Sequence, residues 1–156
     1  MNQNATMGRR EILKAAGLGA LAVAGSGLVA GPAYATPDTA AKAMSKAIGG
    51  ATATAGKVTI KLPEIAENGR TVPITVSVDS PMSASDHVKR IIVMSEGNPS
   101  PEVVEFNLTP DVGKAEISTR IRLGKTQNVI AAAVMSNGSV YTGKKQVKVT
   151  IGGCGG

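Results

Sequence analysis

The sequence predicts an all-β domain of the immunoglobulin-like sandwich class, preceded by a short helix and followed by a flexible glycine-rich arm. Seven strand-like runs fall between residues 57 and 151, and turn residues separate them at regular intervals. Within the runs apolar and polar residues alternate, as they do in strands that have one buried face. The chain has no Trp and one Cys, so the Cys–Trp–Cys core of antibody domains is absent.

The N-terminal segment, residues 1–35, has the pattern of an export signal that is removed. Arg9 and Arg10 precede Lys14, a stretch of small uncharged residues follows, and Ala35 closes an Ala-x-Ala cleavage site. The adjacent arginines predict the twin-arginine route, which carries folded cargo to the periplasm. The alternative is a membrane anchor, but the stretch is near the lower length limit of a span and is diluted by glycine and alanine. We therefore expect cleavage after Ala35 and no stable membrane anchoring.

Residues 36–50 predict the short helix. Thr36 fits the N-cap and Pro37 suits the first helical position, where a missing N–H costs nothing. The apolar residues of one face lie three and four positions apart: Ala41, Met44 and Ile48. This face has to cover something, either the sheet of the same chain or a second subunit, and the pattern does not choose between them.

The β-sandwich is predicted over residues 57–151. Its runs span residues 57–62, 72–78, 88–95, 102–108, 115–123, 128–135 and 140–151. Asn137-Gly138 is the strongest hairpin signal, because this pair favours the tight turn that joins two antiparallel strands. The last run leads directly into the glycine-rich segment.

The predicted arm, residues 152–156, reads Gly-Gly-Cys-Gly-Gly and holds the single cysteine, Cys154. Its glycines are Gly152, Gly153, Gly155 and Gly156. An exported protein with one cysteine forms no internal disulfide, so the thiol is used chemically or pairs between molecules. Glycines accept unusual torsions and bring no side chains that would block a narrow channel. This pattern predicts a covalent attachment site on Cys154 that is presented to the active sites of other proteins.

Four other hypotheses fit the same residues. The tail could be frayed with an incidental cysteine, or Cys154 could form an intermolecular disulfide. A peroxiredoxin-like thiol enzyme would need a lowered thiol pKa, and the sequence places no cation next to Cys154. Activation of the terminal Gly-Gly as a thiocarboxylate would need ATP, from which the export signal removes the chain.

Charge and composition exclude several other functions. The net charge of +6 falls to +4 without residues 1–35, and the chain has one Phe and two Tyr, so stacking on nucleic acid bases is not expected. One His and one Cys are too few ligands for most transition-metal sites, so we expect no metal and no cofactor. His87 precedes a strand without a Ser, Cys or Asp spaced to work with it, which favours a turn residue over a catalytic one.

Several segments together resemble the SoxY family of sulfur-oxidation proteins. They are the Gly-Gly-Cys-Gly-Gly tail after V-K-V-T-I, the twin-arginine signal, L-P-E-I-A-E-N-G-R-T-V-P-I-T-V, N-P-S-P-E-V-V-E-F, and I-S-T-R-I-R-L-G-K-T-Q-N-V-I-A-A-A-V-M-S-N-G-S-V. The resemblance covers essentially the whole chain after the signal.

The resemblance implies an immunoglobulin-like periplasmic carrier that is not itself an enzyme and binds no cofactor. It implies a heterodimer with a SoxZ-like subunit and a cargo of thiosulfate-derived sulfur on Cys154. It also implies transient partners: a SoxAX-like c-type haem enzyme that attaches thiosulfate, a SoxB-like hydrolase that releases sulfate, and in some systems a SoxCD-like sulfane dehydrogenase.

Overall fold

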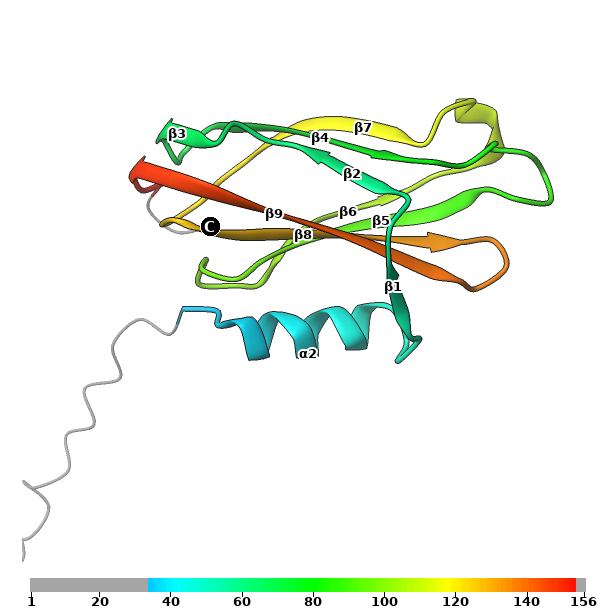
Figure 1. Ribbon diagram of the computed structural model, residues 1–156, viewed down its shortest axis with the longest axis horizontal. Helices are drawn as coiled ribbons and strands as arrows, with labels where there is room; N and C mark the ends of the chain where they lie inside the picture. Colours follow the sequence, from blue (N-terminus) through cyan, green and yellow to red (C-terminus); the bar gives the residue numbers. More distant parts are fainter. Residues whose placement is uncertain (1–33, 154–156) are drawn as a thin grey trace, which may run out of the picture. The chain divides into compact units, whose positions relative to one another are not determined.

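A computed structural model describes residues 34–153, which form a two-sheet β-sandwich with one helix against an outer face (Figure 1). The predicted fold class is confirmed. In chain order the elements are α2 (Pro37–Ala47), β1 (Ala53–Ala55), β2 (Val58–Lys61), β3 (Ile65–Asn68), β4 (Val72–Val78), β5 (Val88–Ser95), β6 (Glu102–Asn107), the 3-10 helix η1 (Pro110–Val112), β7 (Glu116–Ile121), β8 (Gln127–Met135) and β9 (Val140–Ile151).

The long strand β9 organises the larger sheet. This sheet has the order β1-β9-β8-β5-β6, and β3 also pairs with β9, whereas the smaller sheet has the order β2-β4-β7. The antiparallel pairing of β9 with β8 ends at Val147, and its last residues pair in parallel with β3 as far as Ile151. The C-terminal end of β9 therefore reaches the end of the sandwich where the β3–β4 turn and the β7–β8 loop also lie (Figure 1).

All seven predicted strands are present, and two short ones were missed. The missed strands, β1 and β3, have three and four residues and run parallel to β9. Every residue of β1 is exposed, so its sequence carries no alternation to detect. The Asn137-Gly138 hairpin is confirmed: Gly138 has φ +85° and donates its N–H to the Met135 carbonyl.

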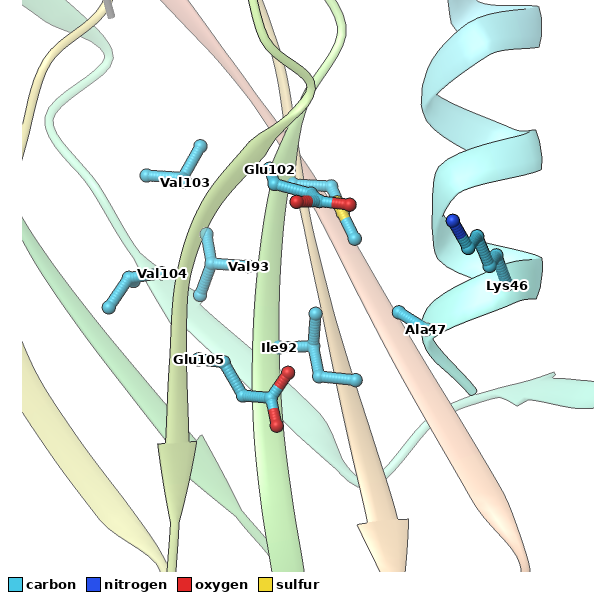
Figure 2. Close-up of a pocket in the computed structure, with 9 residues that line it drawn as sticks. Lys46, Ala47, Ile92, Val93, Glu102, Val103, Val104 and Glu105 are labelled. Carbon is cyan, nitrogen blue, oxygen red and sulfur yellow. The ribbon is translucent and has the colours of Figure 1, made fainter. Parts of the chain in front are cut away.

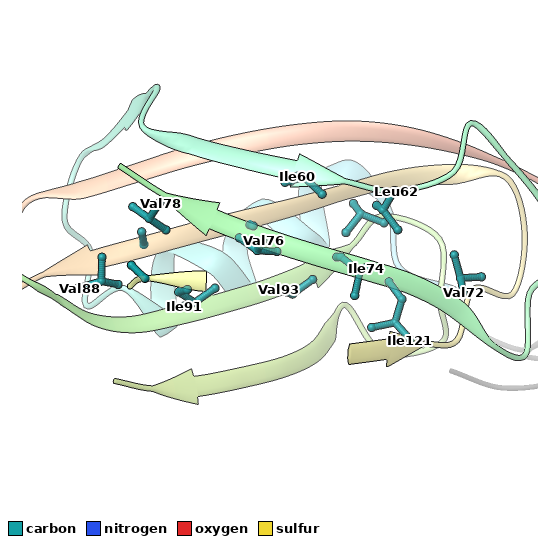
Figure 3. Packing of buried hydrophobic residues seen from close by; sticks show 14 of the residues in the cluster. Ile60, Leu62, Val72, Ile74, Val76, Val78, Val88, Ile91, Val93 and Ile121 are labelled. Carbon is teal, nitrogen blue, oxygen red and sulfur yellow. The ribbon is translucent and has the colours of Figure 1, made fainter. Parts of the chain in front are cut away.

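The main core fills the space between the two sheets. Along β4 the residues Val72, Ile74, Val76 and Val78 are buried in alternation, as the sequence pattern requires. Figure 3 shows them pointing between the sheets together with side chains of β5. Each buried side chain of this size contributes about 1.5–3 kcal/mol when it leaves water, so this layer holds the two sheets together.

The helix α2 covers the outer face of the larger sheet, which answers the question that the sequence left open. Thr36 is its N-cap and forms a capping box with Thr39. Met44 is buried and belongs to a second apolar cluster with Ile92 and Met94 of β5. Ala41, predicted on this face, is exposed, and Ala40 is buried instead. Within the described residues no helix has the length and apolar character that a membrane span requires.

Candidate functional site

The structure describes the predicted arm up to the residue before the cysteine. Gly152 and Gly153 lie within the described part of the chain. The other predicted arm and signal residues lie outside it: Arg9, Arg10, Cys154, Gly155 and Gly156. The site can therefore be built from the segments that surround Gly153.

Three backbone hydrogen bonds join the end of β9 to two loops. The Gly69 N–H donates to the Ile151 carbonyl at 2.7 Å, and the Leu123 N–H donates to the Gly69 carbonyl at 2.8 Å. The Gly153 N–H then donates to the Leu123 carbonyl at 3.0 Å. These bonds join the segment after β9 to the β3–β4 turn and to the β7–β8 loop.

Gly153 is buried, although the sequence predicted a flexible arm that begins at Gly152. A Cβ on Gly153 would lie 2.8 Å from the Gly69 oxygen and 3.0 Å from the Arg70 Cα. A Cβ on Gly152 would collide with the Gly124 carbonyl oxygen. Glycine at these two positions permits close backbone packing, whereas the flexibility of the arm stays a prediction.

Two buried amide side chains, those of Asn98 and Gln127, hold the β7–β8 loop in place. The Asn98 Nδ2 donates to the Arg122 carbonyl at 2.8 Å, and its Oδ1 accepts from the Gly124 N–H at 2.9 Å. The same Oδ1 accepts from Gln127 Nε2 at 2.9 Å, and Gln127 Oε1 accepts from the Gly97 N–H at 2.7 Å. Asn98 and Gln127 are 2% and 6% exposed, so these bonds are made away from water and determine the loop position.

The sequence did not single out these supporting residues. Gly69 and Asn98 each belong to a turn signal of the sequence, Glu67-Asn68-Gly69 and Gly97-Asn98-Pro99, and no pattern marks Gly124. Asn98 and Gln127 look like ordinary loop and strand-end residues, because no local pattern predicts which polar side chains become buried partners. Their role depends on contacts between segments that are far apart in the chain.

The predicted cleavage residue, Ala35, contacts the β5–β6 loop at Asn98. It is 5% exposed, and its N–H donates to the Asn98 carbonyl at 2.7 Å. The preceding Tyr34 ring lies 4.8 Å from the Lys125 Nζ, within the range of a cation–π contact. Cleavage after Ala35 stays a prediction, and it would remove both contacts, one on the β5–β6 loop and one on the β7–β8 loop.

A groove of about 450 Å³ lies between α2 and β6, on the outer face of the larger sheet (Figure 2). Lys46 of the helix and two carboxylates of β6, Glu102 and Glu105, line it. Arg90 pairs with Glu105 at 3.1 Å and also donates to the Ala47 carbonyl at the C-terminal end of the helix, at 2.8 Å. Arg90 thus attaches the helix to the sheet, and a cation at a helix C-terminus is favourable.

His87 and the acidic residues form no recognisable metal centre. The His87 Nδ1 lies 3.1 Å from the Ser83 carbonyl oxygen, and its backbone N–H donates to the Ser136 hydroxyl at 3.2 Å. Across residues 34–153 no three His, Cys, Asp or Glu side chains are grouped to hold a metal ion. The contacts of His87 are those of a residue that orders a loop.

One carboxylate near β9 has a perturbed pKa. Glu96 is 7% exposed in its side chain, and burial alone would raise its pKa. Hydrogen bonds from Lys144 Nζ and Asn128 Nδ2, both 2.6 Å long, together with the Lys144 charge, lower the pKa below its ordinary value of 4.5. The Glu96 carboxylate ties β8 and β9 to the end of β5.

Comparisons with known proteins agree with this fold and this C-terminal segment. The family model "Sulfur oxidation protein SoxY" matches residues 44–154. The solved sulfur carrier protein SoxY from Chlorobium limicola f thiosulfatophilum is 34% identical, with a TM-score of 0.60, over 71% of this chain and 96% of that one. A search of curated proteins gave no match.

Solved superoxide reductases share the fold at lower identity. Neelaredoxin from Ignicoccus hospitalis is 23% identical with a TM-score of 0.54, over 74% of this chain and 94% of that one. A putative superoxide reductase from Thermotoga maritima is 18% identical with a TM-score of 0.54, over 62% of this chain and 93% of that one. These likenesses concern the sandwich alone. The family model and the Chlorobium structure, in contrast, cover most of the chain, and the chain belongs to the SoxY family.

Proposed function

We propose that this protein is a periplasmic sulfur carrier that holds thiosulfate-derived sulfur on Cys154 and presents it to partner enzymes. The family match carries the proposal, because it extends to residue 154 and so includes the single cysteine of the chain. The Chlorobium relative of the same family is described as a sulfur carrier protein. The chain itself is then a substrate holder and not an enzyme.

The position of the arm supports this role. Gly153 leaves the sandwich at the meeting point of the β3–β4 turn and the β7–β8 loop. Cys154 directly follows Gly153, which is a buried residue of the domain. A carrier needs such an arrangement, because the domain supplies the recognition surface while a short segment supplies the thiol.

The chemistry divides between the carrier and its partners. In the first step the Cys154 thiolate and the outer sulfur of thiosulfate form an S–S bond, and the two electrons released leave one at a time through the c-type haem of a SoxAX-like enzyme to an external electron acceptor. In the second step a SoxB-like hydrolase adds water to the terminal sulfonate, which leaves as sulfate with two protons, and a persulfide remains on Cys154. A SoxCD-like dehydrogenase would oxidise that persulfide further.

The proposed assembly includes a SoxZ-like subunit as a stable partner. Export through the twin-arginine route would carry the two folded subunits together. This gives a chain for which we expect no cofactor a reason to use that route. Coexpression of both chains followed by size-exclusion chromatography tests this pairing, and a carrier that elutes alone would contradict it.

The central test is the transfer of sulfur to the thiol. We expect incubation with thiosulfate and a SoxAX-like enzyme to add the mass of one thiosulfate-derived group to the wild-type protein and none to Cys154→Ser. Gain of the same mass by Cys154→Ser would contradict the proposal, because this variant keeps the domain and lacks only the thiol.

The alternative of a thiol enzyme would need a cation close to Cys154. In the described part of the chain, the Arg70 Cα would lie 3.0 Å from a Cβ on Gly153, the residue before the cysteine. A peroxiredoxin-like enzyme requires a thiolate at neutral pH, which a nearby cation favours. Titration of the thiolate by its ultraviolet absorbance separates the two functions: a strongly lowered pKa together with peroxide turnover would support the enzyme.

A further inference from the structure

The segment before Cys154 is held more firmly than a carrier arm of five glycine-rich residues would be. We propose that Gly69, Gly152 and Gly153 form a backbone clasp, and that the pivot of the arm therefore lies after Gly153. The clasp is a positioning device for Cys154, and its role in transfer rests on the proposed function as a carrier. In the clasp, Gly152 and Gly153 serve close backbone packing.

The hydrogen bonds of the clasp engage three segments in sequence. Gly69 donates to Ile151 and accepts from Leu123, and Leu123 in turn accepts from Gly153. No flexible side chain takes part, so the geometry depends on backbone positions that the sheets and the Asn98 amide already fix. The last link, between Gly153 and Leu123, is the one that anchors the residue next to the cysteine.

Steric contacts explain why glycine is required at each point. A Cβ on Gly69 would collide with the Leu123 carbonyl oxygen and would lie 2.7 Å from the Gly153 nitrogen. The obstacles at Gly152 and Gly153 are also backbone atoms, which cannot rotate away as a side chain can. Gly124 differs, because a Cβ there would meet its nearest neighbour at 3.7 Å, an ordinary contact distance.

The clasp limits how far the thiol can reach. An extended residue spans about 3.3–3.6 Å, so a pivot after Gly153 shortens the reach of Cys154 by about 7 Å compared with a pivot after Ile151. A receiving active site must therefore approach the end of the sandwich closely, next to the β3–β4 turn and the β7–β8 loop. Opening of the Gly153–Leu123 link would lengthen the arm by these two residues.

Amide exchange measured by NMR on the full chain tests the clasp without any partner protein. In the wild-type protein we expect the Gly153 amide to exchange at least about tenfold more slowly than an amide in an unstructured chain, because it is buried and hydrogen-bonded. An exchange rate equal to the unstructured rate would overturn the proposal, and this measurement does not depend on any variant.

Matched alanine variants then test the steric argument. We expect Gly69→Ala to abolish the protection of Gly153 and to speed the motion of a nitroxide label on Cys154, whereas Gly124→Ala leaves both unchanged. Equal behaviour of the two variants would contradict the clasp. If Gly69→Ala does not fold, Gly152→Ala replaces it, since its clash lies after the last strand and its expected effect is the same.

These outcomes are separate from those of the carrier test. An unprotected Gly153 amide in a wild-type protein that still accepts sulfur on Cys154 would refute only the clasp. A protected Gly153 amide in a protein that never accepts sulfur would refute only the carrier function.

Discussion

Replacement of Asn98 by alanine should destabilise the whole domain, because this one side chain fixes the loop that holds the end of β9. It makes three hydrogen bonds, to the Arg122 carbonyl, the Gly124 N–H and the Gln127 amide, and it is 2% exposed. Alanine would keep the backbone and leave these groups without their partner. Water cannot easily take over these hydrogen bonds, because the site is buried.

The expected loss of stability follows from the count of bonds. A hydrogen bond contributes a net of about 1 kcal/mol, and a buried group left unsatisfied costs about 1–3 kcal/mol, so Asn98→Ala should lower the free energy of unfolding by about 3 kcal/mol. With a urea m-value of about 1–3 kcal/mol/M, the unfolding midpoint should fall by about 1–3 M. Urea titration followed by circular dichroism measures this shift.

Asn107→Ala is the matched control. Asn107 is exposed at the end of β6, and its replacement should change the free energy of unfolding by less than about 0.5 kcal/mol. If Asn98→Ala were as stable as this control, the buried amide network would not support the loop. The reasoning about the site beneath Gly153 would then be refuted.

Two further predictions concern pH and the helix. Because the folded-state pKa of Glu96 is lowered, its carboxylate contributes stability that is fully present above the unfolded pKa and is lost as the pH falls through the folded pKa. The drop in urea midpoint from neutral pH to about pH 3 should therefore be smaller in Glu96→Gln than in the wild type, and an equal drop would contradict this assignment. Met44→Ala should lower the free energy of unfolding by about 2–3 kcal/mol, because it leaves a cavity in the apolar cluster between α2 and the sheet. Ala41→Ser on the exposed face of the helix should change the free energy of unfolding little. Equal losses in the two variants would show that the helix does not pack as described.

Much of the fold was predictable because burial repeats along the chain. Alternation located the seven longer strands, and the capping residue Thr36 located the helix start. The strands β1 and β3 were missed because they have few residues and depend on pairing with β9. Pairing of this kind is a property of the assembled sheet and leaves little trace in a short segment.

The candidate site also has features that the sequence predicts and features that it does not. Cys154 stays a prediction from the sequence, which rests on its being the single cysteine of a chain that carries the pattern of an export signal. The behaviour of Gly152 and Gly153 could not be predicted, because glycine serves both for flexibility and for close packing. Only the positions of Gly69 and Leu123 distinguish these two uses, and those residues are remote in the chain.

The most direct test of the carrier function is to locate the sulfur adduct on the chain. After reaction with thiosulfate and a SoxAX-like enzyme, trypsin should release a peptide that begins at Val149, after Lys148, and contains Cys154. We predict that this peptide gains the mass of the thiosulfate-derived group and that a reductant removes it. An unmodified peptide under conditions in which the partner enzyme is active would contradict the account.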